Sequence, residues 1–412
     1  TNMEALRLFR SLSRAQRNTF IACFLGWTLD ALDFFLLTFV FVPVAHDFGR
    51  TIPQVTFAIT ITLMMRPLGA LIFGWLGDRF GRRVPLMIDI AFYSLVELLT
   101  AFAPNFATFL LLRALFGIGM GGEWGLGASL AMESLPTPAR GLFSGILQQG
   151  YAFGVLLASL VYWIVFPIFG WRGLFVAGAL PALLVIYIRA HVPESPVWER
   201  NRASGRRMKF DLRQFAKEHG ALLVYATLLM AAFNYMSHGT QDLYPTFLEK
   251  QRGFGVSATS TITIVYAIGM ICGGTVIGFL SQRWGRRRCI ILSAICGMLL
   301  IPAWIFSPGT PLLIAGGFLM QFMVQGAWGV VPVHLNELSP AEFRGTFPGL
   351  AYQLGNFAAA YAAQQQASLA YHFRDANGNP NYALTMALVE CFVFLAIILL
   401  AAIGPEKRGR EF

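Results

Sequence analysis

Hydrophobic residues fall into twelve long runs separated by short polar stretches. The runs lie near residues 19–45, 54–77, 84–103, 106–132, 141–166, 172–190, 219–248, 258–281, 289–306, 310–335, 344–370 and 381–404. An α-helix needs about 20 predominantly apolar residues to cross the hydrocarbon core of a bilayer. The pattern therefore predicts an all-α membrane protein with twelve transmembrane helices.

The second six runs repeat the first six. Gly77-Asp78-Arg79-Phe80-Gly81-Arg82-Arg83 returns as Ser281-Gln282-Arg283-Trp284-Gly285-Arg286-Arg287, an offset of 204 residues. Glu133 and Arg140 return as Glu337 and Arg344 with the same offset. Such a repeat predicts two pseudo-symmetric six-helix bundles, which is the plan of the major facilitator superfamily. We expect an N-terminal bundle at 1–192, a cytoplasmic linker at 193–217 and a C-terminal bundle at 218–412.

The first copy of this loop resembles a signature of that superfamily, Gly-x-x-x-Asp-Arg-x-Gly-Arg-Arg, which starts here at Gly74. The second copy has Gln282 in place of the aspartate. Charge pairs at these loops can act as gates between the two halves, although positive loops also serve topology alone. The gating candidates are Asp78, Arg79, Arg82, Glu133, Arg140, Arg283, Glu337 and Arg344, with Glu133 near the first Arg cluster and Glu337 near Arg283 or Arg344.

Composition and charge agree with a membrane protein. Hydrophobic residues make up 56% of the chain and charged residues 13%, and the mean hydropathy is +0.60. The net charge of +10 is distributed unevenly, because 24 Lys and Arg residues fall on one set of connecting segments and five on the other. This asymmetry indicates that both termini are cytoplasmic and that the charge reports topology in the plasma (inner) membrane, not nucleic-acid binding. The basic N-terminal segment is interpreted as a lead-in to the first helix, not as a signal peptide.

Three polar residues share one helical face in the seventh run. Asn234, His238 and Asp242 follow one another at intervals of four residues, which places them on the same side of a helix. Such groups are costly in a lipid-facing helix and are tolerated where they face a polar cavity. They predict a substrate and proton site; a polar seam between two helices is the alternative.

The surrounding segment resembles a family signature. It matches the motif Asn-x-x-Ser/Thr-His-x-Ser/Thr-Gln-Asp-x-x-x-Thr of the lactate permeases, in the sialate:proton symporter group, at every specified position from Asn234 to Thr246. The resemblance implies proton-coupled uptake of short monocarboxylates. It also implies roles for Asn234, His238, Asp242 and Gln353 in substrate recognition or proton coupling, and a role for Arg66.

Arg66 is a further candidate, because it lies twelve residues before Asp78 and therefore about 18 Å along the helix, near mid-membrane. Its guanidinium stays charged and suits a carboxylate. The partner is either the substrate or Asp30 or Asp33 of the first helix, and a substrate anion that displaces the aspartate would raise its proton affinity.

Other polar and acidic residues can complete the site. Tyr352 and Gln353 of the eleventh run and Gln149 and Tyr151 of the fifth can line the same cavity. The neighbouring Asp242 stabilises a charged His238, so this pair predicts a proton relay. Asp30, Asp33 and Glu123 are alternative carriers of the coupling proton, and the sequence does not choose among them.

The leading hypothesis is a monomeric proton symporter of lactate, pyruvate or acetate, with the substrate, the proton and the bilayer as its partners. Transport of sialic acid or another larger organic acid is the first alternative, and a membrane receptor built on a transporter fold is the second. No Ser/His/Asp order, HExxH motif or P-loop occurs, so we expect no enzyme activity. The five cysteines form no CxxC pair, and we expect neither a metal nor a cofactor.

Overall fold

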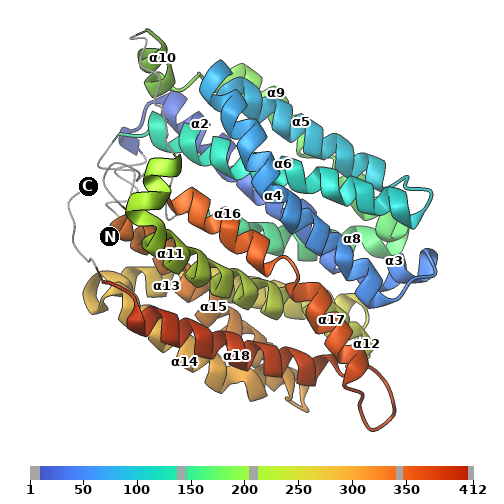
Figure 1. Cartoon of the computed structure of the whole chain (residues 1–412). Coiled ribbons are helices and arrows are strands. Elements are labelled where there is room, and N and C mark those ends of the chain that lie inside the picture. Colours follow the sequence, from blue (N-terminus) through green and yellow to red (C-terminus); the bar gives the residue numbers. More distant parts are fainter. Residues whose placement is uncertain (1–9, 137–142, 144–145, 204–211, 340–346, 407–412) are drawn as a thin grey trace.

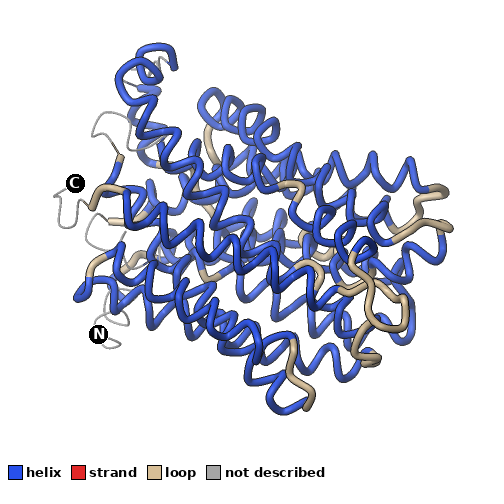
Figure 2. Tube along the Cα trace, turned by 60° about the horizontal axis from the view of Figure 1, so that its bottom comes forward, coloured by secondary structure: helices blue, strands red, loops and turns tan. Residues whose placement is uncertain are grey.

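A computed structural model describes residues 10–136, 143, 146–203, 212–339 and 347–406. These residues form helices joined by short turns, and no strand occurs among them. The long helices run side by side between two ends of the molecule (Figures 1 and 2). We call the terminal side the end at which α2 (Arg14–Thr38) begins and α18 (Tyr382–Ile403) ends.

The first bundle is built around α6. Its helices are α2, α3 (Phe41–Asp47), α4 (Ile52–Phe80), α5 (Arg83–Thr100), α6 (Phe106–Ser134), α8 (Gly150–Ala177) and α9 (Ala182–His191). Within it, α6 packs against α4, α5 and α2, and α2 packs against α8. A short helix, α10 (Pro196–Ala203), follows inside the segment predicted as a linker.

The second bundle repeats this arrangement. Its helices are α11 (Leu212–Gln241), α12 (Tyr244–Lys250), α13 (Val256–Trp284), α14 (Arg286–Ile305), α15 (Thr310–Leu338), α16 (Phe347–Ala359), α17 (Ala362–His372) and α18. Here α15 packs against α13 and α14, and α11 packs against α16 and α18. The two bundles meet where α8 contacts α13 and where α4 contacts α16 and α17.

Nine segments of the described chain are long and apolar enough to cross a membrane. One of them, Ile146–His191, contains two predicted spans, because Gly170 interrupts its helix with a φ of 64°. The remaining two predicted spans are either too charged or too short, as continuous helices, to be counted among these nine segments. Helix α5 carries Arg83, Asp89 and Glu97, and the eleventh run is broken into α16 and α17.

Spans one and seven are broken at equivalent places. Helix α2 gives way to α3 at Phe39–Val40, and α11 gives way to α12 at Asp242–Leu243, an offset of 203 residues that differs by one from the 204 of the sequence repeat. Pro43 and Pro245 lie in the first turns of α3 and α12. Proline is accepted there because its missing N–H would have no partner within the helix.

The repeated loops have the same backbone geometry in both bundles. Gly81 and Gly285 have φ values of 97° and 96°, which a residue with a side chain rarely adopts. In each loop a glutamate caps the helix that follows. Glu194 accepts the N–H of Arg82 at 2.7 Å, and Glu406 accepts the N–H of Arg286 at 3.0 Å. These carboxylates satisfy amides that α5 and α14 leave without helical partners.

The same loops carry ion pairs, each within one bundle. Arg82 and Glu133 are 3.3 Å apart, and Glu133 also accepts a hydrogen bond from Ser195. In the second bundle Arg286 and Glu337 are 3.2 Å apart. The described pairs therefore tie neighbouring helices of one bundle together and do not bridge the two halves.

The predicted pairing of Glu337 with Arg283 is wrong. Arg283 is exposed and lies over the Phe279 ring at 5.3 Å, whereas Arg286, the repeat of Arg82, turns inward. Arg79 is likewise exposed, over Trp75 and Phe80. The side chain of Asp78, and both Arg140 and Arg344, lie outside the part of the chain that the structure describes.

Glycines allow α4 and α6 to approach closely. A Cβ at Gly117 would collide with the carbonyl of Thr62, and a Cβ at Gly121 with the carbonyl of Arg66. Gly117, Gly121 and Gly125 recur every four residues along α6, but no described atom lies within 4 Å of a Cβ at Gly125. The helix contact thus depends on two of the three glycines, and one of them lies against the backbone of Arg66.

We expect Gly121→Ala to destabilise the protein by about 1–3 kcal/mol, because the new methyl group pushes α4 away from α6. Gly125→Ala is the matched control on the same helix and should be neutral. The thermal midpoints of the purified proteins in detergent measure both effects, and equal midpoints for the two variants would contradict the assignment.

Glu337→Gln should also lower the thermal midpoint, because it leaves Arg286 buried, with 4% exposure, and without its carboxylate. Breaking a buried pair in this way costs about 3–5 kcal/mol. Arg283→Gln is the control from the same loop, and it should leave the midpoint unchanged. A larger loss in Arg283→Gln than in Glu337→Gln would restore the pairing predicted from the sequence.

Candidate functional site

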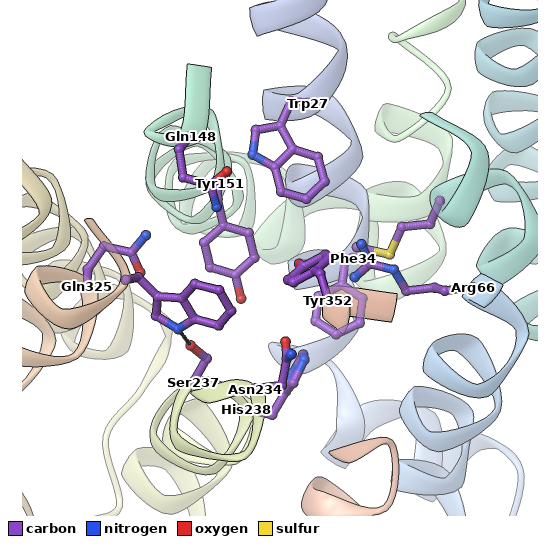
Figure 3. Close-up of a pocket in the computed structure, with 12 residues that line it drawn as sticks. Trp27, Phe34, Arg66, Gln148, Tyr151, Asn234, Ser237, His238, Gln325 and Tyr352 are labelled. Atoms are coloured by element: carbon purple, nitrogen blue, oxygen red, sulfur yellow. Dashed lines mark hydrogen bonds between the residues drawn. The ribbon is translucent and has the colours of Figure 1, made fainter. Parts of the chain in front are cut away.

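A pocket with a cavity volume of about 20 Å³ lies between the two bundles. Both bundles supply its walls, and the side chains converge on it from opposite sides (Figure 3). The lining residues are Trp27, Phe34, Arg66, Met120, Gln148, Tyr151, Asn234, Ser237, His238, Gln325, Trp328 and Tyr352. A pocket lined by several aromatic rings with convergent polar groups is typical of a small-molecule site.

Arg66 is the charged residue that lines the first-bundle wall. Its side chain is 2% exposed, and its Nε and Nη2 atoms have no hydrogen-bond partner among the described residues. The guanidinium lies over the Tyr352 ring, 5.6 Å from its centre (Figure 3). A buried guanidinium with two unused donors is prepared to receive an anion with two oxygens.

Asp30 and Glu123 are the acids that interact electrostatically with Arg66. All four of their carboxylate oxygens are buried without a hydrogen-bond partner, so the direct ion pair between Arg66 and Asp30 does not form in this structure. Neither acid lines the pocket. Both acids therefore interact with Arg66 from outside the lining of the pocket.

A second set of charges lies deeper in the first bundle. Arg113 forms an ion pair with Glu97 and donates a hydrogen bond to Thr100 at 3.3 Å. Asp33 is close enough to interact with both Arg113 and Glu97. Glu97 and Asp89 were not predicted as site residues, unlike Asp33, although both interrupt the apolar run of α5 and are fully buried.

Helix α11 presents the signature to the pocket. Asn234, Ser237 and His238 line the cavity, whereas Asp242 is fully buried one turn beyond it. His238 Nδ1 and Asp242 Oδ2 are 3.0 Å apart. The carboxylate orients the imidazole and leaves its other nitrogen toward the cavity side of the helix. The predicted relay residues are therefore in contact, with His238 at the pocket and Asp242 behind it.

Trp328 fixes another signature residue, because its indole Nε1 donates a hydrogen bond to Ser237 Oγ at 2.5 Å (Figure 3). The Asn234 amide donates to the carbonyl of Met230 at 2.9 Å. On the first-bundle side, the Phe34 ring packs 5.6 Å from the His238 ring. These contacts give the polar groups of α11 fixed directions at the cavity.

Direct contacts join the two bundles on either side of the pocket. Tyr151 donates a hydrogen bond to Gln241 at 3.0 Å, and Gln241 donates to Gln321 at the same distance. Toward the terminal side, the Trp124 and Tyr352 rings are 5.2 Å apart. The substrate pocket is therefore bounded by contacts that must change if it is to open.

Two predicted lining residues do not line the pocket. Gln149 lies against Gly274 of α13, and its neighbour Gln148 takes the expected place at the cavity. Successive residues of a helix point about 100° apart, so the correct face is one residue earlier. Gln353 is buried in α16, and its amide has no hydrogen-bond partner in the described chain. Asn356, one turn later, has the same character and was not predicted.

Comparison with known proteins identifies the family. The Major Facilitator Superfamily profile matches residues 23–363. The chain is 31% identical to the probable 4-methylmuconolactone transporter of Cupriavidus pinatubonensis over 97% of this chain and 93% of that protein. It is 29% identical to the carboxylic acid transporter protein homolog of Saccharomyces cerevisiae over 100% of this chain and 71% of that protein.

The sialic acid transporter NanX of Escherichia coli is 27% identical over 84% of this chain and 85% of its own length. Among solved structures, a partially occluded inward-open form of the xylose transporter XylE from E. coli superposes with a TM-score of 0.78 at 17% identity, over 97% of this chain and 100% of that chain. That similarity confirms the predicted fold. The chain belongs to the Major Facilitator Superfamily and is a multi-pass secondary transporter of that type, not an enzyme.

Proposed function

We propose that the protein carries short monocarboxylates, such as lactate, pyruvate and acetate, together with protons by alternating access. The observation that supports this proposal most directly is the unpaired guanidinium of Arg66, which shares one pocket with the signature residues Asn234 and His238. A carboxylate is the substrate group that would satisfy the two unused donors of Arg66. Several relatives are named as transporters of organic acids, which agrees with this chemistry.

The substrate carboxylate would bind to Arg66, and the rest of the molecule would extend toward α11. Asn234 and Ser237 offer polar atoms there for a hydroxyl or keto oxygen, and Gln148 offers a side-chain amide. Phe34, Trp328 and the other aromatic residues of the wall suit a short aliphatic part and exclude water. Removing water strengthens the attraction between the guanidinium and the anion.

Proton coupling would follow from Asp30 and Glu123, the acids that interact electrostatically with Arg66. In the empty carrier, the positive charge of Arg66 interacts with Asp30 and Glu123. A bound anion would interact with Arg66 in their place. An acid that loses its favourable interaction with a cation binds a proton more readily. Anion and proton would thus bind together, and the loaded carrier would keep the same net charge as the empty one.

His238 and Asp242 would supply the path by which a proton enters the pocket. Their contact at 3.0 Å lets the imidazole hold a proton against the carboxylate. Both termini would lie in the cytoplasm, because Lys and Arg are concentrated on the connecting segments of that side. The protein would be a monomer in the plasma membrane. The pocket then faces the cytoplasm or the exterior alternately as the bundles rock.

A larger organic acid is the second candidate. One relative is named a sialic acid transporter, and the guanidinium of Arg66 would suit the carboxylate of a larger acid equally well. Uptake of labelled lactate, pyruvate, acetate and sialic acid into proteoliposomes, with and without an inward pH gradient, tests both candidates. Saturable uptake of sialic acid without uptake of the short acids would replace the first proposal by the second.

Arg66→Lys should raise the KM for lactate by about 10- to 100-fold, because an ammonium replaces the bidentate guanidinium and one charge-assisted hydrogen bond is worth about 1.5–3 kcal/mol. Arg79→Lys is the matched control on α4, since Arg79 is exposed outside the pocket. Initial uptake rates over a range of lactate concentrations give the KM. An unchanged KM in Arg66→Lys would remove the arginine from substrate binding.

His238→Ala should abolish accumulation of lactate driven by an acidic exterior, because the proton then has no relay into the pocket. Exchange of labelled for unlabelled lactate at equal pH needs no net proton movement and should continue. Proteoliposome uptake under both conditions separates the two activities, with His46→Ala on α3 as the control. Normal gradient-driven accumulation in His238→Ala would contradict the relay.

A further inference from the structure

The second bundle contains a buried acid that the proposed mechanism does not use. Glu390 lies on α18 with 0% exposure, and both of its carboxylate oxygens lack a hydrogen-bond partner among the described residues. It is not part of the pocket wall. Asp30, Glu97 and Glu123 of the first bundle each interact with an arginine, whereas no ion pair to Glu390 occurs among the described residues.

The surroundings of Glu390 are apolar or neutral. Tyr235 of α11 is the titratable side chain that interacts with it, and Tyr361 in turn faces Tyr235. Helix α17 contributes Gln366, an uncharged amide. A carboxylate without a cation or donor at this depth costs several kcal/mol, whereas a neutral carboxylic acid does not carry that penalty. The site therefore suits Glu390 in its protonated form.

Glu390 lies against the signature itself. A Cβ at Gly239 would collide with Glu390 Oε1 and would approach Gln366 Nε2 to 3.0 Å. Gln366 Nε2 donates a hydrogen bond to the carbonyl of Gly239 at 3.1 Å, whereas Gln366 Oε1 has no donor in the described structure. A protonated Glu390 has one O–H to donate, and Gln366 offers an acceptor that is otherwise unused.

We propose that Glu390 is a permanently protonated positioning residue that shares its proton with Gln366 and so holds the backbone of α11 at Gly239. Gly239 directly follows His238, so this contact fixes the direction of the imidazole that faces the pocket. All three residues belong to helices of the second bundle, which would move as one body during transport. Glu390 would therefore stay neutral through the whole cycle and carry no coupling proton.

The inference rests on the proposed function, since lactate uptake is one of its readouts. Glu390→Gln keeps a neutral donor and acceptor of the same shape, and it should retain the KM, the pH profile and gradient-driven accumulation of the wild type. Glu390→Leu fills the apolar space without a donor to Gln366. It should raise the KM about tenfold and alter the pH profile, because the signature backbone is no longer held.

A measurement without substrate separates the two proposals. Diethylpyrocarbonate modifies exposed imidazoles, and peptide mass spectrometry reports its rate at His238. Glu390→Leu should change that rate several-fold, and Glu390→Gln should not. If the wild type transports no monocarboxylate but His238 responds in this way, the proposed function fails and the positioning role stands.

Two outcomes would overturn the role of Glu390. Loss of gradient-driven accumulation or of folding in Glu390→Gln would show that the ionisable group itself is needed. Wild-type KM and wild-type His238 reactivity in Glu390→Leu would show that nothing is positioned.

A double-mutant cycle with Gly239 tests the contact directly. Gly239→Ala alone should reduce uptake at least tenfold, because the methyl group collides with Glu390. In Glu390→Ala the same methyl group enters space that the carboxyl has left, so Gly239→Ala should cause no further loss there. Independent effects of the two substitutions would place Glu390 and Gly239 out of contact and would reject the proposal.

Discussion

One permanent positive charge sets the conditions for the rest of the fold. Arg66 cannot lose its proton, and it lies in a helix surrounded by apolar segments. The Tyr352 ring and the electrostatic interaction with Asp30 and Glu123 compensate this charge without using the Nε and Nη2 donors. An arginine with all of its donors paired would be more stable in this apolar interior, but it could not bind a ligand through those donors. The incomplete pairing is therefore the feature of this interface on which the proposed substrate binding depends.

The two bundles handle polarity in different ways, although their backbones repeat. The first bundle buries formal charges, with Arg113 bonded to Glu97 and five acids for two arginines among its described buried residues. The second bundle lines its half of the interface with amides, hydroxyls and one imidazole, and its isolated Glu390 has no cation. The two bundles thus share the same helix packing but differ in the chemistry of their buried side chains. The second bundle keeps its buried ion pair of Arg286 with Glu337 away from the pocket, where it supplies Asn234, Ser237 and His238 opposite the charged Arg66 of the first bundle.

The sequence predicted features that depend on spacing along the chain. The offset of 204 residues anticipates the matched turns at Gly81 and Gly285, and the four-residue interval anticipates the contact of His238 with Asp242. Predictions from the sequence were wrong where a contact depends on the direction in which a side chain points. Gln148 and not Gln149 lines the pocket, because Gln149 is the residue that precedes α8 and its side chain lies against Gly274 of α13. The pairing of Glu337 with Arg286 was accessible in principle, since Arg286 repeats Arg82, but the choice among four neighbouring arginines needs the turn geometry.

The signature of α11 also explains how binding and movement are linked. His238 and Asn234 face the cavity, while Gln241, three residues after His238, accepts a hydrogen bond from Tyr151 of the other bundle at 3.0 Å. The helix ends at Gln241, and the chain turns at Asp242 into α12. A shift of His238 toward a bound anion therefore also moves the residue that holds the bundles together. Opening on that side breaks one neutral hydrogen bond, worth about 0.5–1.5 kcal/mol, which thermal motion supplies readily. The contact between the bundles on that side is therefore too weak to set the barrier to transport by itself.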